Sequence, residues 1–122
     1  MIYNKSLIKS FVYAIEGISH ALKDNRNLRI HFGVGAIVIF AGIFFRVNGF
    51  ELGIIGIMIL LVIMAEMINT AIEEMVDLIV TEHKKQAKIA KDVAAGMVLV
   101  AVVGSVIAGI FIFVPHILKL LG

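Results

Sequence analysis

Residues 52–80 read LGIIGIMILLVIMAEMINTAIEEMVDLIV, and the first charged side chain in this run is Glu66. A helix needs about 20 mostly apolar residues to cross about 30 Å of hydrocarbon. No proline separates the aliphatic first half of the run from the more polar second half. We therefore predict one long helix over about 52–80, which crosses the membrane in its first half and is amphipathic in its second half.

Two more apolar runs flank this helix. The earlier run, residues 32–45, is uncharged and, with its flanks, predicts a short first span over about 29–47. The later run predicts a third span over about 93–115 that ends at Pro115, and its glycines and alanines permit close helix packing. The pair Asn48-Gly49 predicts a turn between the first two spans. The fold class that follows is an all-α membrane protein with three transmembrane helices.

The composition places the whole chain in lipid. Hydrophobic residues make up 61% of the 122 positions, whereas soluble domains contain roughly 45–50%. The absence of cysteine excludes disulfides, thiol nucleophiles and zinc–thiolate sites. No linker or repeat divides the sequence, so we expect a single integral membrane domain over residues 1–122.

The N-terminal segment has helical periodicity. Apolar residues recur at helical spacing at Leu7, Ile8, Phe11, Val12, Ile15 and Ile18, and polar residues occupy other positions. This pattern predicts an amphipathic helix over about 5–24. The helix lies either on the membrane surface or against the spans, and both arrangements place it beside the lipid headgroups. Because the segment lacks the unbroken apolar core of a signal peptide, we expect it to remain attached.

Basic residues are unevenly distributed between the segments outside the spans. They gather before the first span and between the second and third, at Lys5, Lys9, Lys23, Arg26, Arg29, Lys84, Lys85, Lys88 and Lys91. The positive-inside rule therefore predicts a cytoplasmic N-terminus and a cytoplasmic loop over 81–92. Anionic headgroups account for the lysines and for the net charge of +2, so the charge requires no nucleic-acid partner.

The second half of the long helix carries a polar stripe. At 100° per residue, four side chains fall within about 80° of one another; they are Glu66, Asn69, Glu73 and Asp77, and Thr70 shares the stripe. A carboxylate in hydrocarbon costs on the order of 3 kcal/mol, so a cation, a metal ion or protons must compensate it. The alternative is a solvated helix face. A solvated face is the favoured interpretation for Glu74, and for Asp77 and Glu82 the two interpretations are equally supported. For Glu66, apolar neighbours on both sides in the sequence argue against a solvated face.

The loop predicted over 81–92 is rich in charged residues, namely Glu82, His83, Lys84, Lys85, Lys88, Lys91 and Asp92. Lysines facing carboxylates can hold a magnesium-bound polyphosphate, and they can equally contact headgroups alone. The sequence contains neither the phosphate-binding loop GxxxxGK[ST] nor the HRD and DFG motifs of protein kinases, and it lacks HExxH. Any nucleotide site here is therefore of an uncommon kind.

Four segments carry a resemblance to a known family. They are SFVYAIEG at 10–17, NRNLRIH at 25–31, EMINTAIEEMVD at 66–77 and AKIAKDVAAGMVL at 87–99. The third contains the pattern ExxNTAIExxxD. In this order the segments resemble the small bacterial membrane-embedded lipid kinases, the diacylglycerol kinase and undecaprenol kinase family. The chain is most similar to the Gram-positive undecaprenol kinase branch, because it lacks the N-terminal tryptophans typical of the diacylglycerol branch.

The resemblance implies a homotrimer in the bacterial cytoplasmic membrane, with ATP and Mg2+ as cofactors and active sites built partly across subunit boundaries. It implies that Glu66 is the catalytic base and Glu73 a magnesium ligand. Asn69 and Asp77 match polar residues of the site, and Arg29 matches a basic residue near the lipid entrance. Positions that contact or support ATP are matched by Tyr13, Glu82, His83, Lys84, Lys91 and Asp92.

One position departs from the family pattern. The family places a second metal-binding glutamate where this chain has Asn25, directly after Asp24. An amide oxygen can bind magnesium but adds no charge. Either Asp24 serves the metal through a local shift, or the metal site at Asn25 is weaker.

Together these features predict phosphorylation of a lipid alcohol at the cytoplasmic membrane boundary. Glu66 would accept the hydroxyl proton, while Glu73 with magnesium and Lys91 would stabilise the triphosphate. Undecaprenol is the expected acceptor and diacylglycerol the alternative. A function of another class is a small ion or proton transporter that uses Glu66 and Glu73, although transport favours acidic residues at mid-membrane or on both sides.

Overall fold

The computed structural model describes residues 6–82 and 84–122, and every regular element in these residues is a helix. The helices are α1 (Leu7–Asp24), α2 (Arg26–Phe44), α3 (Gly49–Ile79) and α4 (Lys85–Leu121). The last three are long and apolar enough to cross a membrane. The predicted all-α architecture with three spans is confirmed.

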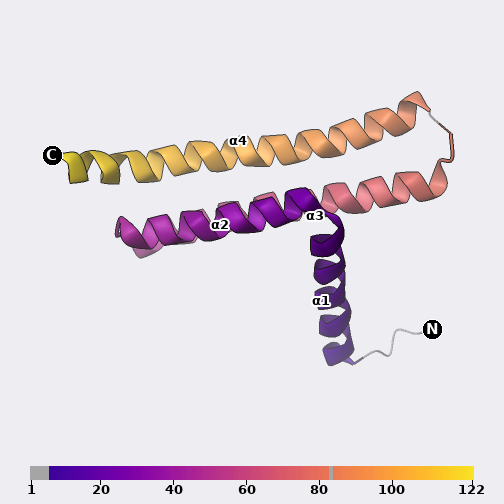
Figure 1. Cartoon of the computed structure of the whole chain (residues 1–122), viewed down its shortest axis with the longest axis horizontal. Coiled ribbons are helices and arrows are strands. Elements are labelled where there is room, and N and C mark those ends of the chain that lie inside the picture. Colours follow the sequence, from indigo (N-terminus) through magenta and orange to yellow (C-terminus); the bar gives the residue numbers. More distant parts are fainter. Residues whose placement is uncertain (1–5, 83) are drawn as a thin grey trace.

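The three apolar helices lie side by side, and α1 points away from them at the start of α2 (Figure 1). Helix α3 packs against both α2 and α4. The C-terminal part of α3 and the N-terminal part of α4 extend together beyond the start of α2 (Figure 1). Two helices therefore project past the corner at which α1 turns into α2.

That corner is made by Asn25, which ends α1 and begins α2. Its backbone is extended and its N–H donates to the carbonyl of Ala21 at 2.9 Å, while its side-chain Oδ1 accepts from the N–H of Leu28 at 3.2 Å. Asparagine is a strong N-cap because this bond satisfies an otherwise unpaired amide of the first turn. Leu28 is 0% exposed and packs with Ala21 and Ile63 of α3, so the corner has its own apolar core.

The length of α3 indicates where its polar stripe lies relative to the membrane. At about 1.5 Å per residue, the 31 residues of α3 extend about 46 Å, well beyond about 30 Å of hydrocarbon. Glu66 lies about 26 Å along the helix from Gly49, and Asp77 about 42 Å. If α3 enters the hydrocarbon near Gly49, Glu66 lies just inside the opposite boundary and Asp77 lies outside it.

The connection between α2 and α3 is short and capped on both sides. Arg46 has a positive φ of 58°, and the N–H of Val47 donates to the carbonyl of Gly42 at 3.1 Å, a pattern that ends helices. Asn48 then caps α3 in a reciprocal pair of hydrogen bonds with Glu51. The turn predicted at Asn48-Gly49 lies slightly earlier, at Phe45 and Arg46, and Asn48-Gly49 begins α3.

The observed bounds of α4 differ at both ends from the span predicted over about 93–115. Residues 85–92, expected in a loop, are helical, since they contain good helix formers and no breaker. Pro115, expected to end the span, lies inside α4, which continues to Leu121. Proline removes one backbone hydrogen bond, a loss that membrane helices tolerate when neighbouring groups compensate. Directly after it, Nε2 of His116 lies 3.0 Å from Oε1 of Glu51, which ties the end of α4 to the start of α3.

The contact of α2 with α3 depends on Gly35. A Cβ atom there would lie 2.8 Å from Cγ2 of Ile59, whereas a Cβ atom at Gly33 would meet nothing within 4 Å. We expect Gly35→Ala to lower the free energy of unfolding in detergent by about 1–3 kcal/mol, because the branched Ile59 must move. The matched variant Gly33→Ala should be neutral or stabilise by up to about 1 kcal/mol. Equal melting temperatures for the two variants would contradict this packing.

Candidate active site

Glu66 is the buried acid of the structure. It is 3% exposed, and among the described residues it is the one charged side chain classed as buried. Its Oε1 accepts a hydrogen bond from Nδ2 of Asn25 at 3.0 Å, and its Oε2 lies 3.8 Å from Nε2 of His31. Both neighbours belong to the corner and the first turns of α2. A carboxylate in this position is poorly hydrated but has hydrogen-bonding partners.

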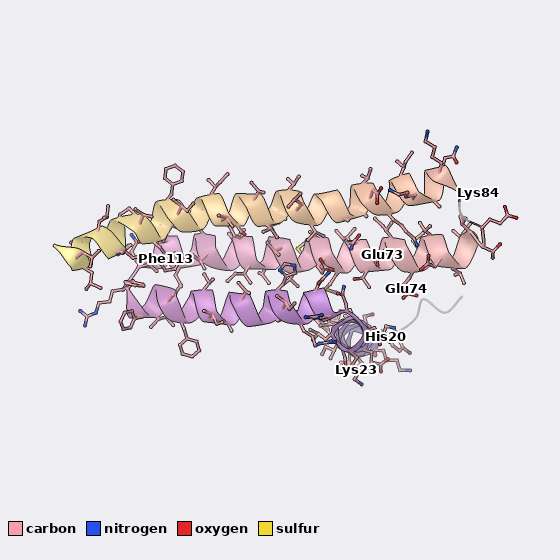
Figure 2. All side chains as sticks on the ribbon, turned by 45° about the horizontal axis from the view of Figure 1, so that its top comes forward. His20, Lys23, Glu73, Glu74, Lys84 and Phe113 are labelled. Carbon is pink, nitrogen blue, oxygen red and sulfur yellow. The ribbon has the colours of Figure 1, made fainter. Side chains whose placement is uncertain are left out.

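A pocket of about 250 Å³ opens beside Glu66. We call it the corner pocket; it is lined by Asp24, Asn25, Arg26, Asn27, Glu66, Asn69, Thr70, Glu73 and Glu74. One wall is the α1–α2 corner and the other is the polar stripe of α3. Figure 2 shows Glu73 and Glu74 on the part of α3 that extends past the corner, with Phe113 near the opposite end of the bundle.

Asn69 is a second buried polar group in this stripe. It is 8% exposed, and its Nδ2 donates to Oε1 of Glu73 at 3.3 Å. Its Oδ1 is buried and has no hydrogen-bond partner in the part of the chain that the structure describes. A buried acceptor without a partner is costly. The unpaired amide oxygen of Asn69 therefore favours a cation or a water molecule at that atom.

Oxygen donors of this kind suit magnesium. Within residues 6–82 and 84–122, no group of three or more His, Cys, Asp or Glu side chains is placed to hold a metal ion. Magnesium does not require such a group, because it commonly binds one or two carboxylates together with water and substrate phosphates. Glu73 and Asn69 fit a magnesium ion whose remaining ligands come from a phosphate substrate and water.

A larger pocket of about 720 Å³ lies at the turn from α3 to α4. We call it the loop pocket; it is lined by Val76, Asp77, Val80, Thr81, Glu82, Lys84, Lys85, Ala87, Lys88 and Lys91. Nζ of Lys91 donates to Oδ1 of Asp77 at 2.5 Å, which joins α4 to α3 across the pocket. Four lysines around one pocket provide ammonium donors for a polyphosphate. The first two helical turns of α4, rather than a loop, present three of them.

An apolar groove runs between the three long helices and has a volume of about 280 Å³. His31 lines it at the level of Glu66, and Phe113 lines it near the other end of α4. Its other lining residues are Val34, Gly35, Val38, Ile55, Met58, Ile59, Val62, Val102, Ser105, Val106, Ala108 and Gly109. His31 is therefore the only ionisable residue among the described residues that line this groove, and its ring also lies near the buried carboxylate of Glu66.

The structure brings most of the candidate residues into two groups. The corner pocket contains Asn25, Glu66, Asn69 and Glu73. The loop pocket contains Asp77, Glu82, Lys84 and Lys91. Both pockets lie along α3, and Lys84 stands at the far tip of the projecting helices (Figure 2).

Four candidates have other positions. Asp92 pairs with Lys88 at 2.6 Å, one helical turn away. Tyr13 is half exposed on α1 and lines neither pocket. Arg29 donates from Nη1 to the carbonyls of Leu22 and Lys23, both at 2.8 Å, and so holds the end of α1 against α2. His83 lies outside the described residues.

Sequence reasoning missed His31 and the donor role of Asn25. The polar stripe of α3 predicted Thr70, whose hydroxyl donates to the carbonyl of Glu66 at 2.9 Å and accepts from Nδ2 of Asn25. A histidine among the first apolar residues of a span was the available signal for His31, because an unpaired polar ring is costly there. No local pattern could have identified the bond between Asn25 and Glu66, which are 41 residues apart.

Comparison with known proteins gives a consistent result. The model of the prokaryotic diacylglycerol kinase family matches residues 12–113. The chain is 41% identical over 107 residues to an undecaprenol kinase of Bacillus subtilis, covering 88% of this chain and 87% of that protein. It is 39% identical over 117 residues to a diacylglycerol kinase of Synechocystis, covering 95% and 67%. A diacylglycerol kinase of Haemophilus influenzae is 32% identical over 109 residues, covering 88% and 92%.

Proposed function

The chain belongs to the prokaryotic diacylglycerol kinase family and is a lipid kinase, and on this premise we propose that it phosphorylates undecaprenol with ATP and Mg2+. The observation that carries the proposal is the buried carboxylate of Glu66, which is 3% exposed, lines the polar corner pocket and lies 3.8 Å from His31, a residue of the apolar groove. Such a carboxylate can meet a lipid hydroxyl group at the boundary between hydrocarbon and water. Membership of a kinase family also favours this function over an ion or proton transporter.

Phosphoryl transfer requires mainly positioning and neutralisation of charge, with a base for the proton of the nucleophile. Glu66 is the proposed base, and its poor hydration leaves its oxygens available to the lipid hydroxyl proton. Glu73 and Asn69 lie about 10 Å and 5 Å further along α3 by helix rise. A magnesium ion held by Glu73 and Asn69 would supply neutralisation of charge on the transferred phosphate.

The loop pocket is the proposed site of the nucleotide. Asp77, which lines this pocket, lies about 17 Å from Glu66 along α3 by helix rise. Lys84 and Lys91 would hold the phosphate oxygens, with Glu82 and Asp92 in supporting positions. The pair of Lys91 with Asp77 keeps the ammonium group at the mouth of this pocket. Tyr13 and His83 remain proposed nucleotide contacts, and Arg29 a proposed neighbour of the lipid entrance.

The proposed orientation follows from the same residues. The lysines and acids of both pockets lie on one side of the three spans, and the positive-inside rule makes that side cytoplasmic. ATP is available there. We also infer a homotrimer in the bacterial cytoplasmic membrane, because the family resemblance implies sites shared between subunits and many apolar side chains of α2, α3 and α4 are exposed in the single chain.

The acceptor can be identified by direct competition. Purified protein in mixed micelles should transfer labelled γ-phosphate from ATP to undecaprenol with a kcat/KM at least about tenfold higher than to diacylglycerol, a difference of about 1.4 kcal/mol. Micelles without either lipid are the control for ATP hydrolysis. A preference for diacylglycerol would replace the proposed acceptor and leave the kinase activity in place.

Replacement of the proposed base should stop the chemistry without unfolding the protein. We expect Glu66→Gln to lower kcat by about 10²–10⁴-fold, because the amide fills the same volume but cannot accept the proton. Binding of ATP should persist, since the loop pocket is untouched. A variant with more than about a tenth of normal kcat would show that another group is the base.

The proposed metal ligand has a neighbour that serves as a control. Glu73→Gln should raise the magnesium concentration for half-maximal activity by at least about tenfold, because it removes the carboxylate charge of the proposed ligand. Glu74→Gln removes an equal charge from the same pocket without the Asn69 contact, and its magnesium titration should be close to that of the unmodified protein. Equal shifts in both variants would indicate a general effect of charge rather than ligation.

A further inference from the structure

We propose that Asn25 is a positioning residue for Glu66 and is not a ligand of the metal ion. This inference rests on the proposed role of Glu66 as the base. It is carried by the contacts of a single amide group, which joins the end of α1, the first turn of α2 and the polar stripe of α3.

The partners of Asn25 determine which way its amide points. Its Oδ1 accepts from the backbone N–H of Leu28, which can only donate. Its Nδ2 donates to Oε1 of Glu66 at 3.0 Å and to the hydroxyl oxygen of Thr70, whose own proton goes to the carbonyl of Glu66. A reversed amide would place its oxygen against the carboxylate and its N–H₂ against the helix N–H. The amide nitrogen, which cannot bind a cation, therefore faces the acidic stripe.

This donor has an energetic role because the carboxylate is buried. A buried anion requires hydrogen bonds to its charged form, and bonds to charged groups are about twice as strong as neutral ones. The closer of the two groups on the Glu66 carboxylate is Nδ2 of Asn25, and the other, Nε2 of His31, is 3.8 Å from Oε2.

The same bond sets the direction of the reacting oxygen. With Oε1 held by Asn25, Oε2 is turned toward His31, which lines the apolar groove between the spans. A lipid hydroxyl group arriving from the groove would meet Oε2. Asn25 thus orients the base from a helix cap whose own position is held by the buried Leu28.

Two substitutions separate positioning from ligation. Asn25→Asp keeps a good N-cap for α2 but replaces the donor with a second negative charge against Glu66. Asn25→Ser also keeps a cap but is too short to reach the carboxylate. We expect kcat to fall by at least about tenfold in the Ser variant and further in the Asp variant, with KM for ATP and the magnesium half-saturation within about twofold of normal.

The matched control is Asn48→Asp. Asn48 caps α3 in the way that Asn25 caps α2, but it lies at the opposite end of the bundle. Its replacement should leave kcat unchanged. A loss of kcat there as large as in the Asn25 variants would show that damage to a cap is sufficient, and would overturn the proposal.

Other outcomes also overturn it. If Asn25→Asp keeps its kcat and lowers the magnesium half-saturation, Asn25 is a ligand. If the folded Ser variant keeps normal kcat, the contact with Glu66 has no catalytic consequence. Should the Asp variant fail to fold in a melting assay, the Ser variant decides. Full activity of Glu66→Gln would remove the base role and the positioning role together. A preference for diacylglycerol would change only the lipid used in these assays.

Discussion

The carboxylate of Glu66 is buried where α1 turns into α2, and the rest of the site depends on how that charge is accommodated. A buried carboxylate is costly unless donors face it. Asn25 supplies one donor from the cap of α2, and the apolar core of Leu28, Ala21 and Ile63 holds that cap in place. The direction in which α1 leaves α2 therefore matters to this site, because the residue at that corner also bonds the acid.

The excess length of α3 and α4 divides the molecule into two environments. About 30 Å of each helix suffices for the membrane, and the remainder of both projects past the corner (Figure 1). Glu66 lies at the level of the corner, Asn69 and Glu73 lie further along α3, and the lysines of α4 surround the pocket at the tip. One helix thus arranges a buried acid, an oxygen-rich pocket and a basic pocket in this order along its axis.

Much of this arrangement was predictable from residues close together in the chain. The spacing of Glu66, Asn69 and Glu73 predicted one polar stripe, and the corner pocket confirms that these side chains share a surface. The prediction for α4 was wrong where it used a single residue, Pro115, to mark the end of the helix. Pro115 did not end the helix, because proline removes only one of its backbone hydrogen bonds, and α4 continues to Leu121.

The sequence by itself determined the membrane class, the three spans, the acidic stripe and the family, since hydrophobic runs and helical spacing are properties of neighbouring residues. Only the tertiary structure decided that Nδ2 of Asn25 faces Glu66, that His31 stands between that acid and the apolar groove, and that Arg29 is bound to the carbonyls of α1. These contacts depend on the direction in which α1 leaves α2 and on the depth at which α3 packs. Neither quantity is encoded in a local pattern, because both follow from how side chains 41 positions apart, such as those of Asn25 and Glu66, pack and pair in space.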